Sequence, residues 1–238
     1  MLDNYNERLF SGKGFRSKLH FARYIWFRNK IKEYKCPAET VLELGCFDGK
    51  TIEFLEPLPR RYDGYDANWE GGLDIGIHKW KDYPDYHFKL CTKITDFQPE
   101  DNYFDVSICQ ETIEHLPLAD TEKYIAQLAK STKGYTFISV PNEKGIVFLI
   151  KHMFKALTQP KGDREDYSFA EIFYSTIGNI KKVERHETGH KGFDYSALKK
   201  DLQKYFDVVE TNGLPFTALP ASLNFTVGFV CKRKLVNK

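Results

Sequence analysis

The residue types best suited to chemistry gather in one short segment, Gln110-Glu-Thr-Ile-Glu-His115. His115, with an ordinary pKa of ~6.5, can act as a general base at neutral pH. Glu111 and Glu114 add two carboxylates, and carboxylates and imidazoles are also groups that bind divalent cations. His115 and Glu111 are therefore candidate catalytic residues, and their role depends on the elements that position them.

A second candidate site is the glycine loop Glu43-Leu-Gly-Cys-Phe-Asp-Gly-Lys-Thr51. Gly45 permits a tight turn, and Gly49 permits close backbone approach at the start of the next helix. Leu44 stands where a phosphate-binding P-loop needs its first glycine. Phe47 stands where the dinucleotide fingerprint needs its second glycine. Both phosphate-binding interpretations are therefore excluded by position.

Short apolar runs alternate with helical stretches along the chain, and they predict the scaffold around these sites. Such alternation is typical of βαβ units around a parallel sheet. Strands are predicted at 40–44, 62–65, 86–90, 104–109, 135–140, 206–211 and 225–232, and helices at 17–34, 50–55, 120–130 and 195–205. We expect Asp120 to cap the third of these helices and Gly134 to lie just beyond its end. The predicted fold is α/β: a doubly wound, mostly parallel, Rossmann-like sheet of seven strands whose last pair is antiparallel.

The segments outside this alternation predict how the chain is organised. Residues 1–39 form an N-terminal helical cap, and residues 40–238 form the α/β domain. Within that domain, residues 145–191 are a helical insertion or lid between the fifth and sixth strands. Apolar residues recur at helical spacing through 146–157 beside basic ones, which fits either a packed lid helix or a peripheral membrane contact. Residues 161–174, rich in charged and aromatic side chains, are predicted to be the mobile part of the lid.

The overall composition is that of a globular protein, with 42% hydrophobic and 29% charged residues and a net charge of +2. Five scattered cysteines without a CxxC pair indicate reduced thiols. The polar start of the chain and the absence of a long apolar run argue against a signal peptide and a membrane span. We therefore expect a cytoplasmic protein, in peripheral contact with a membrane at most. Nucleic acid is an unlikely partner because no broad basic surface or stacking platform is visible.

Further motifs follow the glycine loop in register. Asp66 ends the second strand in Gly-Tyr-Asp-Ala, Phe104-Asp-Val opens the fourth, and Ile138-Ser-Val-Pro-Asn142 closes the fifth. With the loop, this series resembles the class I S-adenosylmethionine-dependent methyltransferases over roughly residues 41–142. Phe47 departs from the family pattern by replacing its middle glycine. The resemblance implies that residues 40–238 form a methyltransferase domain.

The resemblance also implies a cofactor, S-adenosylmethionine, and residues that bind it. Asp66 would accept hydrogen bonds from both ribose hydroxyls. The implied cofactor-binding set is Glu43, Gly45, Cys46, Gly49, Asp66, Ala67 and Gln110. Many relatives hold the adenine with an acid after the third strand, and here Thr92, Asp96 and the backbone are alternatives for that contact.

Glu111, Glu114 and His115 form an E-x-x-E-H set, which similar enzymes use to bind a divalent metal such as Mg²⁺, Mn²⁺ or Zn²⁺. These relatives are the small-RNA 2′-O-methyltransferases and the ubiquinone-pathway O-methyltransferases, which complete the site with groups from elsewhere in the chain. His190 is the first candidate for that group here, and His186 is the second. A metal so held would polarise an acceptor hydroxyl. The alternative is that His115 lines the pocket without a metal.

The predicted activity is S-adenosylmethionine-dependent O-methylation of a small-molecule, sugar or lipid-linked acceptor. Two alternatives stay open: a metal-dependent RNA 2′-O-methyltransferase, and a non-catalytic module that keeps the cofactor fold as a binding surface. The acidic and glycine residues of the cofactor motifs argue against the second, since a binding module does not need them. The acceptor and the oligomeric state stay open at this level.

Overall fold

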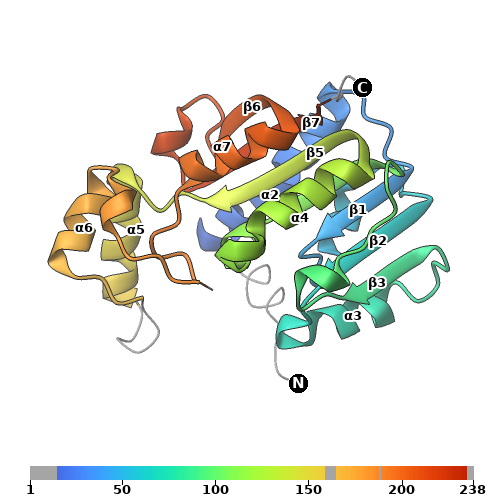
Figure 1. Cartoon of the computed structure of the whole chain (residues 1–238), viewed down its shortest axis with the longest axis horizontal. Coiled ribbons are helices and arrows are strands. Elements are labelled where there is room, and N and C mark those ends of the chain that lie inside the picture. The colour runs from blue at the N-terminus through green and yellow to red at the C-terminus, as the bar shows by residue number, and fades with distance from the viewer. Residues whose placement is uncertain (1–14, 159–164, 188, 235–238) are drawn as a thin grey trace.

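A seven-stranded sheet runs through the molecule in the computed structural model, which describes residues 15–158, 165–187 and 189–234 (Figure 1). The strand order is β3-β2-β1-β4-β5-β7-β6. The strands are β1 (Thr40–Leu44), β2 (Arg61–Asp66), β3 (Tyr86–Leu90), β4 (Phe104–Gln110), β5 (Thr132–Pro141), β6 (Phe206–Leu214) and β7 (Thr226–Arg233). Strands β1 to β5 pair in parallel, whereas β7 pairs antiparallel with both β5 and β6. The predicted fold class is confirmed.

Helices cover both faces of the sheet, which explains why most residues of its central strands are buried. Every residue of β1 is buried, as expected for a strand with no solvated face. One face packs against α4 (Leu118–Ser131) and α7 (Tyr195–Tyr205), through side chains such as Leu128 and Leu202. The other face of the sheet packs against α2 (Phe15–Glu33) and α3 (Gly72–Lys79). The order of strands reverses between β1 and β4, which places ligand-binding loops at the carboxyl ends of these two strands.

Helix α2, the centre of the predicted N-terminal cap, packs directly on the sheet. The Phe27 ring is fully buried and lies 5.3 Å from the Phe137 ring, centroid to centroid. The Trp26 indole N–H donates to Asn212 Oδ1 at 2.9 Å. Lys30 forms an ion pair with Glu210 of β6 at 2.6 Å. The helix therefore belongs to the helical layer of this domain.

Three local predictions need correction. Helix α4 begins at Leu118 with Pro117 at its N-cap, so Asp120 lies in the first turn rather than at the cap. Gly134 lies inside β5, where an added Cβ would stand 2.4 Å from the Asp105 carbonyl oxygen, so close strand approach requires glycine there. The helix expected at 50–55 is a single 3₁₀ turn, Lys50–Phe54, because prolines follow it and cannot donate to a continuing helix.

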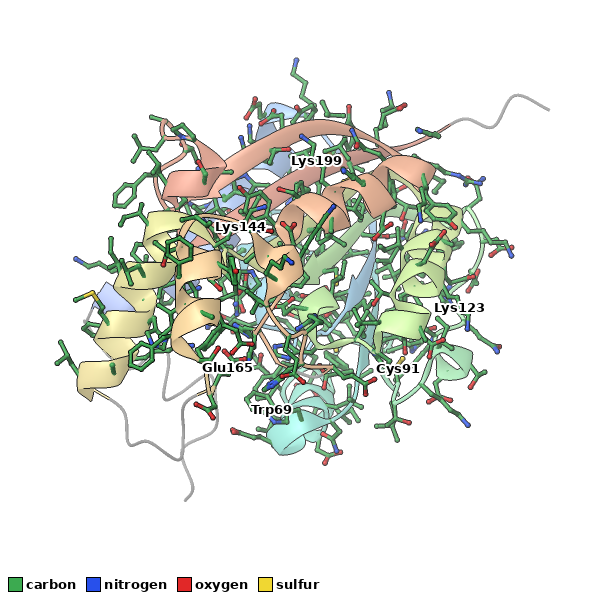
Figure 2. All side chains as sticks on the ribbon, turned by 60° about the vertical axis from the view of Figure 1, so that its left-hand side comes forward. Trp69, Cys91, Lys123, Lys144, Glu165 and Lys199 are labelled. Atoms are coloured by element: carbon green, nitrogen blue, oxygen red, sulfur yellow. The ribbon has the colours of Figure 1, made fainter. Side chains whose placement is uncertain are left out.

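The insertion between β5 and β6 consists of α5 (Gly145–Thr158), α6 (Phe169–Thr176) and a 3₁₀ turn at Ile180–Lys182. Figures 1 and 2 show α5 and α6 side by side, projecting from one end of the sheet. The helix predicted at 146–157 is confirmed. Of the predicted lid at 161–174, residues 161–164 lie outside the described residues, and the remainder contains α6, which opens with a capping box between Ser168 and Glu171. Within the described part of the chain, no helix is long and apolar enough to cross a membrane.

Candidate functional site

The loop after β1 makes its turn through three residues in the left-handed region. Gly45, Phe47 and Gly49 have φ values of 78°, 47° and 71°. Glycine adopts this region freely, but a side chain there costs about 1–2 kcal/mol. The cost at Phe47 is offset by its amide, which donates to Asp66 Oδ2 at 2.9 Å, and by its ring, which packs so closely that a Cβ on Gly72 would stand 2.2 Å away. The departure from the glycine motif is therefore accommodated by contacts that phenylalanine itself makes.

The side chain of Glu43 is buried beneath this loop and stabilises it through hydrogen bonds. Its carboxylate is buried, and its two oxygens accept hydrogen bonds from the Thr51 and Tyr62 hydroxyls, each at 2.6 Å. Burial raises the pKa of Glu43 to about 8, outweighing these two hydrogen bonds, which lower it. Thr51 follows the loop and Tyr62 lies on β2, so both oxygens of the Glu43 carboxylate are hydrogen-bonded within the protein.

This burial predicts a pH dependence of stability. Because the pKa of Glu43 is raised in the folded protein, its contribution is complete below an unfolded value of ~4.5 and is lost as pH rises toward 8. Between pH 5 and pH 8 the wild type should lose about 3–4 kcal/mol more stability than Glu43→Gln, whose side chain cannot ionise. Urea unfolding of both proteins at the two pH values measures the difference. Equal losses of stability in the two proteins would contradict a raised pKa at Glu43.

Asp66, at the end of β2, presents a carboxylate at the carboxyl edge of the sheet. One oxygen accepts from the Phe47 amide and the other from the Asn68 amide, at 2.9 and 2.8 Å. Burial raises its pKa despite these bonds. Each carboxylate oxygen has further lone-pair capacity for a ligand donor. Trp69 and Leu90, beside it, are 56% and 58% exposed, so apolar surface for a flat ring adjoins a polar acceptor.

Two residues after β3 were open alternatives for an adenine contact. Asp96 Oδ2 accepts from the Thr92 amide and hydroxyl and from the Lys93 amide, at 3.0, 3.1 and 3.1 Å. The acid and the hydroxyl are therefore bonded to each other and hold the loop. Of the other predicted cofactor residues, Ala67 is exposed next to Asp66 and the Cys46 thiol is buried against Gly64.

The loops after β1 and β4 touch, which joins the two candidate sites. A Cβ on Gly45 would stand 1.9 Å from Thr112 Oγ1, so only glycine fits beneath that side chain. Gln110, the last residue of β4, is buried, and neither its amide nitrogen nor its amide oxygen has a hydrogen-bond partner among the described residues. Such an unsatisfied amide is typical of a position that bonds a ligand.

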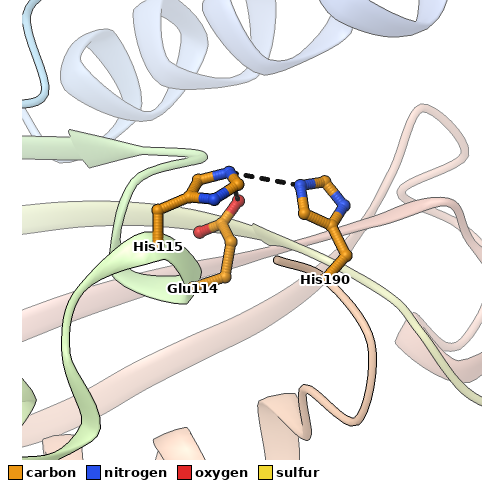
Figure 3. Close-up of side chains that lie close together, drawn as sticks. All are labelled: Glu114, His115 and His190. Atoms are coloured by element: carbon orange, nitrogen blue, oxygen red, sulfur yellow. Dashed lines mark hydrogen bonds and ion pairs between the residues drawn. The ribbon is translucent and has the colours of Figure 1, made fainter. Parts of the chain in front are cut away.

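Glu114, His115 and His190 converge beyond this contact (Figure 3). The Nε2 atoms of the two histidines are 3.2 Å apart, and Glu114 Oε1 lies 4.0 Å from His115 Nε2. One ligand atom from each of the three residues lies within 4.8 Å of the others. The 3₁₀ turn Ile113–His115 after β4 supplies two of them, and the insertion supplies the third. The structure thus places His190 next to the segment after β4, as the sequence predicted, and its role there is a matter for the proposal below.

Glu114 is the buried acidic residue of this cluster. Its side chain is 0% exposed, and neither carboxylate oxygen has a hydrogen-bond donor among the described residues. Burial, and then the Glu111 charge, raises its pKa well above the ordinary value. A buried carboxylate without a donor costs several kcal/mol unless a proton or a cation neutralises it. A carboxylate and two imidazoles are a suitable ligand set for a divalent cation.

The structure does not bring every predicted metal ligand into the cluster. Glu111 has a left-handed backbone with φ 51°, its amide donates to the Ser139 carbonyl, and its carboxylate accepts from Ser139 Oγ at 3.4 Å. It therefore lies beside the cluster but outside the set of converging ligand atoms. His186 is exposed and also lies outside that set.

Sequence reasoning missed three residues that surround the cluster. Arg185 donates to the Glu114 carbonyl at 2.5 Å and also to the Gly189 and Lys191 carbonyls, which ties the insertion to the turn after β4. Glu143, two residues beyond β5, lies 2.5 Å from Lys151 Nζ and 3.5 Å from His190 Nδ1. Burial alone would raise the pKa of Glu143, but Lys151 and His190 lower it to about 2. The sequence Pro-Asn-Glu at the end of β5 indicates that Glu143 lies in a loop, but it does not indicate which side chains Glu143 contacts.

The model of the methyltransferase domain family matches residues 15–210. Several solved structures share the fold. Magnesium protoporphyrin IX methyltransferase from Synechocystis PCC 6803, with bound SAH, has a TM-score of 0.61 and 13% identity, covering 96% of this chain and 92% of that one. An S-adenosylmethionine-dependent methyltransferase from Clostridium acetobutylicum has a TM-score of 0.64 and 11% identity, covering 97% and 96%. The N-methyltransferase NodS from Bradyrhizobium japonicum has a TM-score of 0.57 and 11% identity, covering 91% and 97%. No curated protein matches the sequence.

Proposed function

This chain belongs to the methyltransferase domain family and is an S-adenosylmethionine-dependent enzyme, and we propose that it methylates a hydroxyl group activated by a divalent cation. The observation that carries the proposal is the buried Glu114 carboxylate, which has no hydrogen-bond donor among the described residues and lies next to two imidazoles. Family membership sets aside the interpretation as a non-catalytic module. Calorimetric titration with S-adenosylmethionine tests the cofactor site, and Mn²⁺ binding by the wild type and by Glu114→Gln tests the cation site.

The residues at the carboxyl edge of β1, β2 and β4 fit the cofactor. Asp66 provides acceptors for the ribose hydroxyls, with the exposed faces of Trp69 and Leu90 beside it for the adenine. The Gln110 amide is buried where the loops after β1 and β4 meet and has no partner in the part of the chain that the structure describes, so it is suited to bond the polar end of the cofactor. Glu43 supports the loop from beneath and acts indirectly.

Glu114, His115 and His190 would hold the divalent cation, and these three side chains have distinct tasks. When bound, the cofactor supplies an electrophilic methyl group and the cation lowers the pKa of the acceptor hydroxyl. Glu114 provides the negative charge, and the two histidines orient the acceptor oxygen toward the cofactor side of the site. Glu111, outside the ligand set but close enough for its charge to act on Glu114, is the carboxylate that we assign to receive the hydroxyl proton.

Exposed apolar side chains gather on α5 and on the elements that contact it, α6 and the segment around Leu223, and favour a lipid-linked acceptor and a peripheral membrane contact; we call this set the apolar platform. Its members are Ile146, Ile150, Met153, Phe154 and Leu157 of α5, Phe169 and Phe173 of α6 with Ile177 after it, and Phe216, Leu219 and Leu223. Phe154, Phe169 and Phe173 are 64%, 94% and 59% exposed. At about 150–250 Å² each, these rings alone expose roughly 300–500 Å², as much as the largest patch on a typical monomer.

The charges around the apolar platform favour an anionic bilayer as its partner. Helix α5 contains no acidic residue. Of its two lysines, Lys151 is ion-paired with the buried Glu143, so the charge that α5 contributes beside the platform is that of Lys155. The segment 214–225 contains no charged residue, and Lys181 and Lys182 are exposed beyond α6. Basic side chains beside a projecting apolar surface are typical of helices that lie in a membrane interface.

The double variant Phe154→Ser/Phe169→Ser should release the protein from membranes. We expect the wild type to co-sediment with vesicles of phosphatidylcholine and phosphatidylglycerol, and the variant to lose at least ~10-fold in affinity, because two rings leave the interface. Ile77→Ser, which changes a half-exposed apolar residue of α3 far from the platform, is the matched control. Failure of the wild type to bind, with a dimer in light scattering, would assign the platform to a second copy of the chain.

A further inference from the structure

We propose that Glu143, held by Lys151, is a positioning residue that fixes the proton of His190 on Nδ1 and so turns a bare Nε2 toward the site. This inference rests on the proposed function for the role of His190, and it adds the group that orients that histidine. Glu143 is 3% exposed, and one of its oxygens, Oε1, faces both Lys151 Nζ at 2.5 Å and His190 Nδ1 at 3.5 Å. Lys151 Nζ also donates to the Asn142 carbonyl at 3.1 Å, so α5 is anchored to the end of β5.

The hydrogen-bonding capacities of the two groups determine the tautomer. An ionised carboxylate only accepts hydrogen bonds, so the imidazole nitrogen that faces it must carry the proton. A neutral imidazole has one N–H, and with that proton on Nδ1 the Nε2 lone pair is free for a partner. His190 Nε2 is the atom that faces His115 Nε2 at 3.2 Å in the cluster of Figure 3. A carboxylate that fixes the far nitrogen of a ligand histidine is a common device at metal sites, where it also raises the basicity of the ligand.

The backbone of His190 is held by other groups, which separates its placement from its orientation. Glu165 Oε1 accepts from the His190 amide at 2.7 Å and from the Lys191 amide at 2.8 Å. Arg185 donates to the carbonyls on either side of His190, those of Gly189 and Lys191. Glu165 and Arg185 therefore hold the backbone around His190. What remains for Glu143 is to set which ring nitrogen of His190 carries the proton and how the ring is turned.

The direct test is the tautomer of His190 in the full chain without added metal, measured by long-range ¹H–¹⁵N NMR of protein labelled with ¹⁵N-histidine. His190→Gln assigns the resonances. We expect the Nδ1–H form to dominate in the wild type and the Nε2–H form to dominate in Glu143→Met/Lys151→Met. Removing the two partners together leaves no unpaired buried charge, so the variant should fold. An Nε2–H form in the wild type, or a tautomer unchanged in the double variant, would overturn the proposal.

A second readout connects the tautomer to the site. The affinity for Mn²⁺ alone, measured by electron paramagnetic resonance, should fall about 10- to 100-fold in the double variant, while the affinity for S-adenosylmethionine is unchanged. Asp63→Asn is the matched control, because Asp63 is an equally buried carboxylate that pairs with Lys89 at 2.6 Å away from the site. A wild type that shows the Nδ1–H tautomer but binds no Mn²⁺ would defeat the proposed metal site and leave the role of Glu143 in place. Unchanged Mn²⁺ affinity in the double variant would count against that role.

Discussion

Asp66→Ala is expected to weaken the binding of S-adenosylmethionine by at least ~100-fold. In the proposed cofactor site the aspartate would provide charge-assisted acceptors for the ribose hydroxyls, and each hydrogen bond to a charged group contributes about 1.5–3 kcal/mol. The same carboxylate also accepts from the Phe47 and Asn68 amides, so its loss relaxes the loops on both sides of the cofactor. Isothermal titration calorimetry of the full chain measures the change.

Two further variants separate these effects of Asp66. Asp66→Asn keeps an acceptor of similar shape and should bind the cofactor with intermediate affinity. Asp74→Ala removes a nearby exposed acid that bonds the Asn68 side chain at 2.9 Å, and it should leave the affinity unchanged within ~3-fold. Undiminished binding by Asp66→Ala would defeat the assignment of the cofactor site.

Glu114→Gln should abolish the binding of the divalent cation and at the same time stabilise the metal-free protein. The first effect follows because the variant lacks the one negative charge among the three converging groups. The second follows because the wild-type carboxylate is fully buried with no donor in the described part of the chain, and a neutral amide avoids about 1–3 kcal/mol of the cost of burying its charge. A variant that lost the cation because the site had unfolded would be destabilised, so the opposite signs of the two effects are diagnostic.

The measurements for this prediction are Mn²⁺ binding by electron paramagnetic resonance and urea unfolding in the presence of a chelator. Methyl transfer from tritiated cofactor into a lipid extract should fall at least ~1,000-fold with chelation and with Glu114→Gln. Glu122→Gln, an exposed glutamate of α4, is the control. Full transfer after thorough chelation would leave the reaction to His115 as a general base and reject the cation.

The sequence predicted the sheet well because parallel βαβ units leave a strong local signal. Each central strand is a mostly apolar segment of the right length between turns, as Thr40–Leu44 is apart from Thr40 and Glu43, and burial on both faces favours such a segment. Helix boundaries were weaker, since Asp120 has the residue type of a cap but Pro117 occupies that position. The position of Gly134 depends on the approach of Asp105 from another strand, which no local pattern encodes.

Most of the residues that make up the candidate site could be predicted from the sequence, but the contacts that hold them in place could not. Glu114 and His115 stand together in the sequence, and His190 was found through family resemblance across 75 residues. Glu111 was expected to join them, but the left-handed backbone at that position takes its carboxylate to Ser139. Glu143, Lys151 and Arg185 came only from the structure, because their roles are set by distances between segments that the insertion brings together.

The most direct test of the central claim is anomalous diffraction from crystals of the full chain grown with Mn²⁺ and S-adenosylhomocysteine. Recorded near the manganese absorption edge, the map locates the cation independently of any activity. We predict one dominant peak at bonding distance from Glu114, His115 and His190, on the side of the bound cofactor product. A cofactor product bound at Asp66 with no peak among those three side chains, or with the dominant peak elsewhere, would contradict the claim.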